Sequence, residues 1–132
     1  MGFRIALFAL ALSACTSIAA DERAFEGTRW HVSAIDGRST PPIGDYRLDF
    51  AHREISGRFG CNGFGGSYAV IGDIMSTGEI RSTLMGCPEP AASFESQAFA
   101  VLRLPMQMRW TTARQLTLSN NAGSIELQRQ PR

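Results

Sequence analysis

The sequence contains no lysine, so every positive side chain is an arginine. These arginines do not cluster. Removal of a leader ending at residue 14 would take Arg4 from the thirteen basic residues and leave twelve against twelve acidic ones. A domain with this balance lacks the basic footprint typical of nucleic-acid binding. No apolar run after residue 12 is long enough to span a bilayer.

The motifs of several enzyme classes are also missing. There is no Gly-x-Ser-x-Gly, no Cys-x-x-Cys and no Gly-Lys-Ser/Thr phosphate loop. His31 and His52 have no metal-ligand partner at helical or zinc-finger spacing. Met106 and Met108 offer soft thioethers to copper(I), but their alternation favours a buried strand face. We therefore expect no enzyme, no catalytic residue, no cofactor and no metal.

The N-terminus is typical of a secretory signal. A short positive segment is followed by an apolar run at 5–12 and then by small residues. Leu12-Ser13-Ala14-Cys15 resembles the lipobox of bacterial lipoproteins, in which the cysteine is lipidated and becomes the new N-terminus. We therefore predict a signal peptide at 1–14, lipidation of Cys15, a tether at 15–26 and a folded domain at 27–130.

The predicted lipid would attach the protein to a membrane of the cell envelope. Thr16 after the cysteine is compatible with sorting to the outer membrane, facing the periplasm. The alternative is ordinary signal-peptidase cleavage near Ala19 or Ala20, which would leave a soluble periplasmic or secreted protein.

The two remaining cysteines are Cys61 and Cys87. Three cysteines is an odd number for an oxidising compartment, and lipidation of Cys15 leaves an even pair. We favour a disulfide between Cys61 and Cys87, which would contribute roughly 3–4 kcal/mol to the stability of the domain. Two free buried thiols, or redox or metal chemistry at these residues, are the alternatives.

Most of the chain after residue 27 is predicted to form short strands. Apolar residues alternate with polar ones in several segments, the pattern of half-buried strands. These segments are 28–35, 46–50, 54–59, 67–71, 106–110, 116–118 and 125–127, with 74–80 extended. Trp110 shares the predicted buried face of Met106 and Met108. We predict a mainly β (α+β) fold, a small antiparallel barrel-like sheet of seven or eight strands with one covering helix.

That helix is expected at 91–104. Phe94, Ala98, Val101 and Leu102 form one apolar stripe at 3.6-residue spacing, and Pro105 ends the helix. The segment 60–68 before it holds four glycines, which is typical of a bent strand that passes close to another backbone.

In this order, the elements resemble the META domain, also called the HslJ-like family of heat-shock-associated envelope proteins. The resemblance covers nearly all of 28–129. It rests on a tryptophan in the first strand, a Gly-Cys-Asn element, a Met-x-Cys element and a helix with a glutamate near its start, Glu95. The matching motif residues are Trp30, Gly60, Cys61, Asn62, Phe64, Gly66, Tyr68, Thr83, Met85 and Cys87.

The resemblance implies a small barrel-like fold with one helix, secretion or lipidation, and a setting of stress tolerance rather than a reaction. We interpret Asn62 as a turn residue bonded to its own backbone, and Phe64 and Tyr68 as core or rim residues. The leading hypothesis is a non-catalytic, stress-related binding or stabilising module that takes a protein or a small apolar ligand. The alternative is an inhibitor of an envelope protease or lysozyme, acting through the loop 36–44.

Overall fold

The computed structural model describes residues 22–132. The predicted signal peptide and the lipidation site Cys15 lie outside the described residues. One short 3-10 helix, η1 (Glu22–Ala24), precedes ten strands and one α-helix, α1 (Ala91–Leu102). The strands are β1 (Thr28–Ile35), β2 (Arg38–Ser39), β3 (Tyr46–Ala51), β4 (Glu54–Phe59), β5 (Gly63–Ile71), β6 (Ile74–Thr77), β7 (Arg81–Ser82), β8 (Met106–Thr112), β9 (Gln115–Asn120) and β10 (Gly123–Arg129).

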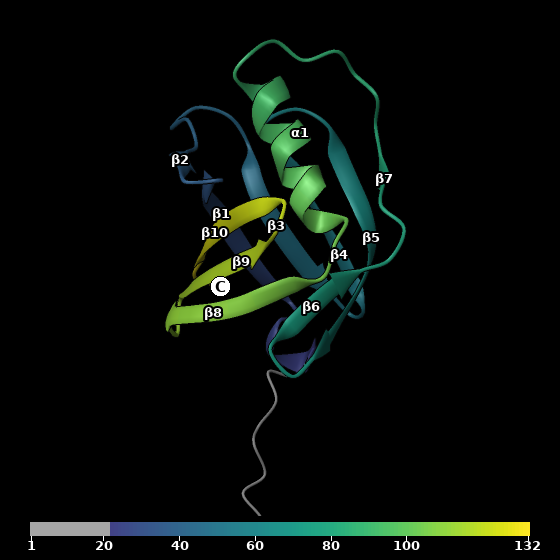
Figure 1. The fold of residues 1–132 in the computed structure, drawn as a ribbon, viewed down its shortest axis with the longest axis vertical. Coiled ribbons are helices and arrows are strands. Elements are labelled where there is room, and N and C mark those ends of the chain that lie inside the picture. Colours follow the sequence, from purple (N-terminus) through teal and green to yellow (C-terminus); the bar gives the residue numbers. More distant parts are fainter. Residues whose placement is uncertain (1–21) are drawn as a thin grey trace, which may run out of the picture.

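Eight of the strands form a closed antiparallel barrel. They follow the order β1-β3-β4-β5-β6-β8-β9-β10, and β10 returns to pair with β1 (Figure 1). The short strands β2 and β7 add to β1 and β5 from outside this ring. Closure removes the free edges that an open sheet would present to other chains. The predicted fold class is therefore confirmed.

Alternation of side chains builds the core of the barrel. In β3, Tyr46, Leu48 and Phe50 are buried while the residues between them are half-buried. The same period of two runs through β1 and β4, because successive side chains of a strand point to opposite faces of the sheet. One continuous hydrophobic cluster fills the interior and continues onto the inner face of α1.

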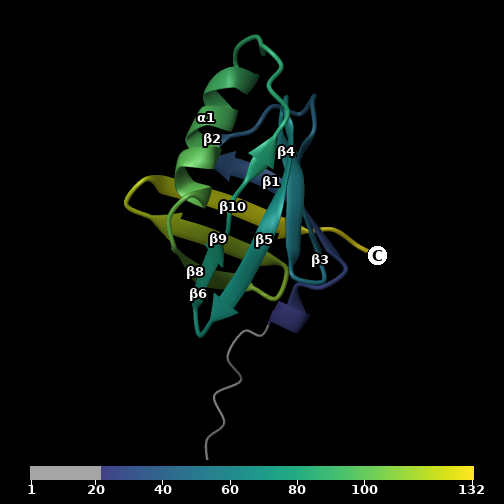
Figure 2. The ribbon, with the colours of Figure 1, turned by 90° about the vertical axis from the view of Figure 1, so that its right-hand side faces the viewer.

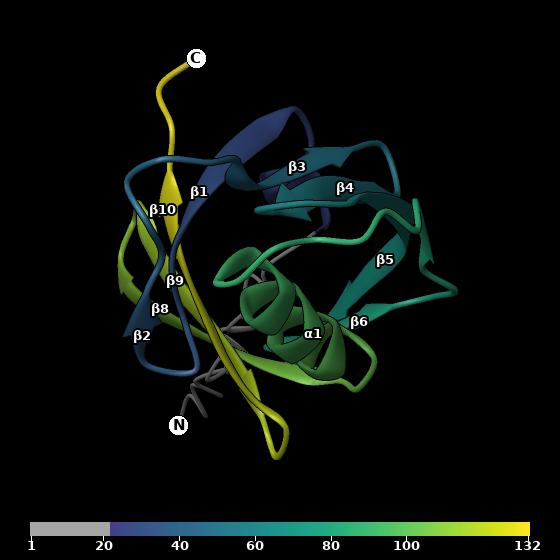
Figure 3. The ribbon, with the colours of Figure 1, turned by 90° about the horizontal axis from the view of Figure 1, so that it is seen from above.

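Each end of the barrel is covered by a different element. Helix α1 covers one end, where it contacts β10, β4 and β1 (Figures 2 and 3). The segment with η1 lies at the opposite end, and Phe25 directly after it is fully buried there. The ring of Phe25 packs against those of Phe50, Trp30 and Trp110 at centroid distances of 5.0, 6.0 and 5.8 Å.

The position of Phe25 shows that the folded domain begins earlier than the expected residue 27. We expected a tether up to residue 26, because the segment before it is polar. Yet Phe25 is part of the core, and Thr28 Oγ1 donates a hydrogen bond to its carbonyl oxygen at 2.5 Å. Among the described residues, the hydrophobic cluster runs from Phe25 to Leu127, so the segment 22–132 contains this cluster and both covers of the barrel.

Two local predictions differ from the structure. Trp110 does not share the burial of Met106 and Met108, because 40% of its surface is exposed and the register of β8 and β9 shifts just after it. Helix α1 ends at Leu102 rather than at residue 104, before the turn that leads to Pro105. Its start is held by Glu89, whose Oε2 accepts hydrogen bonds from Ser93 N at 3.3 Å and Ser93 Oγ at 2.6 Å.

Within residues 22–132, no helix has the length and apolar character that a bilayer span requires.

Candidate functional site

The glycine-rich segment begins with a sharp turn after β4. Gly60 has φ +93°, and a Cβ there would lie 2.5 Å from the hydroxyl oxygen of Tyr46, so only glycine fits. Its amide donates to the Asp45 carbonyl oxygen at 2.8 Å, and Arg58 Nη1 donates to the Cys61 carbonyl oxygen at 2.7 Å. Burial raises the pKa of the Tyr46 phenol. The turn directs Cys61 and Asn62 toward the helix end of the barrel.

Cys61 and Cys87 form a disulfide, with their Cα atoms 6.1 Å apart. The bond joins the turn after β4 to the loop 83–90, which connects β7 to α1. The predicted pairing is confirmed, and the alternative of two free thiols does not apply to this state. The covalent link therefore holds the loop 83–90 against the barrel.

Asn62 adds a set of hydrogen bonds to the same loop. Its Oδ1 accepts from Thr83 Oγ1 at 2.9 Å and from Met85 N at 2.8 Å. Its Nδ2 donates to the Met85 carbonyl oxygen at 3.2 Å and to Glu95 Oε2 at 3.1 Å. These bonds use both acceptor and both donor positions of the amide. Our interpretation of Asn62 as a residue bonded to its own turn was wrong, because its partners lie in the loop and in α1.

Glu95 lies on the buried side of α1 next to this amide. Only 7% of its surface is exposed. Its Oε2 lies 3.5 Å from Cys87 Sγ, which carries no proton in the disulfide and therefore donates nothing. The ligand atoms of Cys61, Cys87 and Glu95 lie within 4.8 Å of one another. Metal coordination by cysteine needs a thiolate, and the disulfide removes both thiolates.

The loop 83–90 is held firmly, yet it turns two large apolar side chains to solvent. Leu84 is 94% exposed and Met85 is 56% exposed. Between this loop and α1 lies a pocket of about 350 Å³, which we call the Glu95 pocket. Leu84, Met85 and Phe99 contribute its apolar walls, and Arg103 lines it from the C-cap position of α1.

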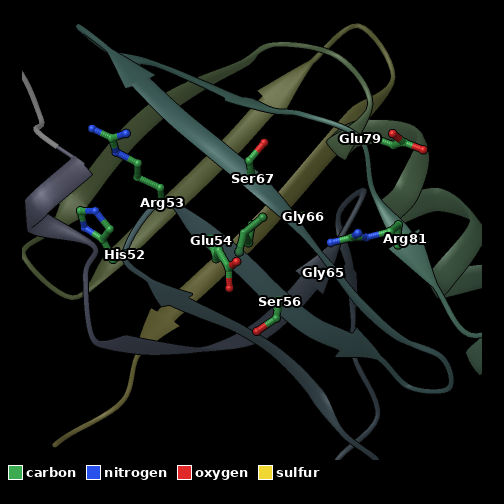
Figure 4. A pocket seen from close by; sticks show the side chains of 10 residues that line it. His52, Arg53, Glu54, Ser56, Gly65, Gly66, Ser67, Glu79 and Arg81 are labelled. Atoms are coloured by element: carbon green, nitrogen blue, oxygen red, sulfur yellow. The ribbon is translucent and has the colours of Figure 1, made fainter.

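A second, larger depression of about 710 Å³ lies on the outer face of β4 and β5, and we call it the Gly65 groove. Its floor is low because Gly65 has no side chain, and a Cβ there would meet nothing closer than 3.8 Å. The side chains around it carry hydroxyls, an imidazole or charges of both signs (Figure 4): His52, Arg53, Glu54, Ser56, Ser67, Glu79 and Arg81. Within residues 22–132, its arginines and glutamates form no ion pair within 4.0 Å.

The motif residues named from the sequence separate into two groups. Trp30, Phe64 and Tyr68 are buried in the core, and Gly66 lets the backbone of Glu79 pass at close range. The others meet at the Glu95 pocket or in the turn that leads to it: Gly60, Cys61, Asn62, Thr83, Met85 and Cys87. His31 and His52 are exposed and lie outside both groups.

Sequence reasoning missed two parts of this site. The interior position of Glu95 has a signal in the helix pattern, because it lies three residues before Ala98 and seven before Leu102, on the edge of the buried stripe. The exposure of Leu84 has no signal, since an apolar residue in a loop is more often buried.

The fold and the site together define a class of protein, a closed eight-stranded antiparallel barrel covered by one helix, with a disulfide-bonded loop beside that helix. The META domain family model matches residues 23–132, and the chain belongs to this family. The match begins two residues before Phe25, in agreement with the role of that residue in the core.

Solved structures show the same fold. A protein from Burkholderia xenovorans, determined by NMR, is 26% identical, with a TM-score of 0.70 over 86% of this chain and 88% of its own. A second NMR structure is 20% identical, with a TM-score of 0.71 over 81% of this chain and 92% of its own, and supports the fold alone. Neither is described by an activity, and no curated protein matches the chain significantly.

Proposed function

We propose that this domain is a non-catalytic binding module of the cell envelope, and that its binding face is the Glu95 pocket with the exposed side chains of Leu84 and Met85. One observation carries the proposal: two exposed apolar side chains stand on a loop held by a disulfide and by Asn62. A surface that is already ordered loses little conformational entropy when a ligand binds. The stress setting is supported by the family resemblance alone.

The filled interior supports a role for the surface. Trp30, Phe64 and Met108 would line an internal ligand cavity, but they are 0%, 6% and 5% exposed and belong to one packed cluster. The interior of an eight-stranded barrel has room either for side chains or for one small ligand, and here side chains of the hydrophobic cluster occupy it. A small apolar ligand or a protein partner is therefore better accommodated outside the barrel, against the loop and α1.

The proposal assigns no catalysis to the domain. His31 and His52 stand on the outer surface, and Cys61 and Cys87 are joined to each other. His52 has an acidic neighbour, Glu26 at 3.5 Å, but both side chains are solvent-exposed. An enzyme site would need titratable groups that converge in a cleft with a nucleophile or a positioned water.

The proposed location is the envelope, with lipid on Cys15. Segment η1 lies at the end of the barrel opposite α1 (Figure 1). An anchor attached through this segment would therefore leave the helix end, with the Glu95 pocket, on the side away from the membrane. Cys15→Ala should release the protein from membranes, and globomycin should block processing of the precursor. Membrane retention of Cys15→Ala would show that the anchor lies elsewhere.

The binding face is tested by capture from envelope extract. The segment 22–132 is immobilised as wild type and as the double variant Leu84→Ser/Met85→Ser, and bound proteins and small molecules are identified by mass spectrometry. The matched control is Ile71→Ser, which removes another apolar side chain, 82% exposed, from the end of β5. We expect the double variant to lose ligands that the wild type and the control retain. Identical capture by all three proteins would refute this binding face.

A second candidate function, inhibition of an envelope protease or lysozyme, is favoured by the loop 36–44. Ile43 is 87% exposed, and the loop is fixed behind it by Thr40, whose Oγ1 donates to the Val32 carbonyl oxygen at 2.7 Å. Rigid loops with one exposed apolar side chain suit insertion into an enzyme cleft. If this function holds, the wild type should inhibit at least one envelope hydrolase and Ile43→Asp should not.

A further inference from the structure

The carboxyl group of Glu95 is the one interior acidic group in the described part of the chain. Its Oε2 accepts a hydrogen bond from Asn62, whereas Oε1 has no hydrogen bond and Glu95 has no ion pair within residues 22–132. Every fully enclosed side-chain nitrogen or oxygen in this part of the chain has a partner. Oε1 is therefore not fully enclosed, and the Glu95 pocket is the opening that Glu95 lines.

Placing a carboxylate in an apolar surrounding is costly unless a cation or hydrogen-bond donors compensate it. One donor is present in Asn62, and the second oxygen has none within residues 22–132. A ligand with a positive charge and N–H groups would complete the site. An anionic ligand would meet Oε1 directly and be disfavoured.

The walls of the pocket specify what should be attached to that positive charge. Leu84, Met85 and Phe99 present apolar surface beside the carboxyl group, and the pocket volume of about 350 Å³ is at the lower end of the range for small-ligand sites. A compact, fully hydrated ion would leave these walls in contact with water. A positive head on a narrow apolar chain would cover them.

The far end of the pocket carries the opposite charge. Arg103 is the C-cap residue of α1, eight residues after Glu95, which places it roughly 12 Å further along the helix axis. A second positive charge at this distance along a ligand would be repelled, and a negative one attracted. Because Arg103 is exposed, its effect on affinity should be a few-fold at most.

We propose that the Glu95 pocket binds an alkylammonium group, with the ammonium on Glu95 Oε1 and the alkyl chain against Leu84, Met85 and Phe99. Such a group occurs in amphiphilic amines and in a lysine side chain of a partner protein. The proposal rests on the binding face proposed above and names its ligand chemistry.

The test uses a set of probes that differ only in their end groups. Octylamine, octanol, 8-aminooctanoate and 1,8-diaminooctane are titrated separately into the segment 22–132, and binding is followed by amide chemical shifts. We expect octylamine to bind at least about tenfold more tightly than octanol, because a hydrogen bond to a charged group is worth that much in affinity. We expect 8-aminooctanoate to equal or exceed octylamine, and the diamine to be the weaker amine.

Variants identify the site. Glu95→Gln keeps an acceptor for Asn62 but removes the charge, so octylamine should fall to the affinity of octanol. Glu126→Gln removes an exposed carboxyl group on β10 and should change nothing. Shifts should map to 83–87 and to the side of α1 that carries Glu95 and Phe99. Equal binding of octylamine and octanol, no shift at millimolar octylamine, or an unchanged Glu95→Gln affinity would each overturn the proposal.

A further arm separates the two sources of the group. An acetylated and amidated tripeptide with a central lysine between two leucines is compared with octylamine and with the same peptide carrying norleucine in place of lysine. Tighter binding of the lysine peptide than of octylamine assigns the site to a protein partner, and the reverse assigns it to a small amine. The wild-type probe series needs no variant to fold. The probes can fail to bind while the difference in capture from envelope extract persists. A failure of the alkylammonium proposal can therefore be distinguished from a failure of the proposed binding face.

Discussion

The Glu95 pocket and the Gly65 groove differ in how the chain has built them. The Gly65 groove is about twice as large, 710 against 350 Å³, but it lies on an outer sheet face with charges of both signs. The Glu95 pocket has an interior carboxyl group, apolar walls and a disulfide beside it. Size alone would therefore select the Gly65 groove rather than the pocket that we propose as the binding face.

The difference lies in how much of the fold supports each surface. Around Gly65, small side chains leave a hollow, and the charged groups at its rim extend into water (Figure 4). Around Glu95, elements far apart in the sequence are tied together, because Asn62 bonds residues 21 to 33 positions away. A surface fixed in this way has a defined shape before any ligand arrives, which is the property that specific binding requires.

The largest expected effect comes from the disulfide. In Cys61→Ser/Cys87→Ser, the free energy of unfolding should fall by about 3–4 kcal/mol, because the unfolded chain loses a closed loop with a sequence separation of 26 residues. Urea denaturation of the double variant and the wild type measures the difference. A loss below about 1 kcal/mol would mean that the hydrogen bonds alone hold the loop 83–90.

The next effect concerns Asn62. Asn62→Ala leaves the Met85 amide and Glu95 without their partner, and we expect a loss of about 2–3 kcal/mol in the free energy of unfolding. Hydrogen exchange at the Met85 amide should accelerate more than exchange in β3. The control Asn121→Ala changes an exposed turn residue and should stay within about 0.5 kcal/mol. Equal losses for both variants would remove the distinction between the two depressions.

The sequence predicts most of the barrel, because a period of two in apolar residues determines which face of a strand is buried. Phe50, Ile55 and Leu118 follow this rule. Trp110 departs from it, since its strand shifts register and its ring packs at the barrel end against Phe25 and Trp30. Periodicity carries no information about such end contacts. The burial of Phe25 was missed for the same reason, because this residue is a single aromatic in a polar segment.

The candidate site is less predictable than the fold. The cysteine pair follows from counting, and the motif residues follow from a family resemblance. The partners of Asn62 follow from neither, because each lies more than twenty residues away and depends on where α1 crosses the barrel. The Glu95 pocket is formed by segments that lie apart in the sequence and meet only in the folded chain. Its walls come from a loop whose sequence shows no recognisable pattern and from a side of α1 that the sequence pattern indicates to be half-buried.

Two neighbouring glycines sharpen the comparison further. A Cβ at Gly66 would lie 2.7 Å from the Glu79 carbonyl oxygen and 2.9 Å from Ile80 Cδ1, so Gly66→Ala should cost about 1–3 kcal/mol of stability. Gly65→Ala places its methyl group into the open groove and should stay within about 0.5 kcal/mol. Thermal unfolding of the two single variants compares them directly. A large loss in Gly65→Ala would show that the groove is part of the packed structure.

The smallest expected effect tests whether the Gly65 groove binds anything. Arg81→Gln removes a solvated charge from its rim, so stability should change by less than about 0.5 kcal/mol and capture from envelope extract should be unchanged. The matched variant Arg103→Gln removes an exposed arginine from the Glu95 pocket and should weaken 8-aminooctanoate a few-fold, leaving octylamine unweakened. Loss of captured ligands in Arg81→Gln, with Arg103→Gln unaffected, would reverse the comparison, because the larger and more polar depression would then be the one that recognises a partner.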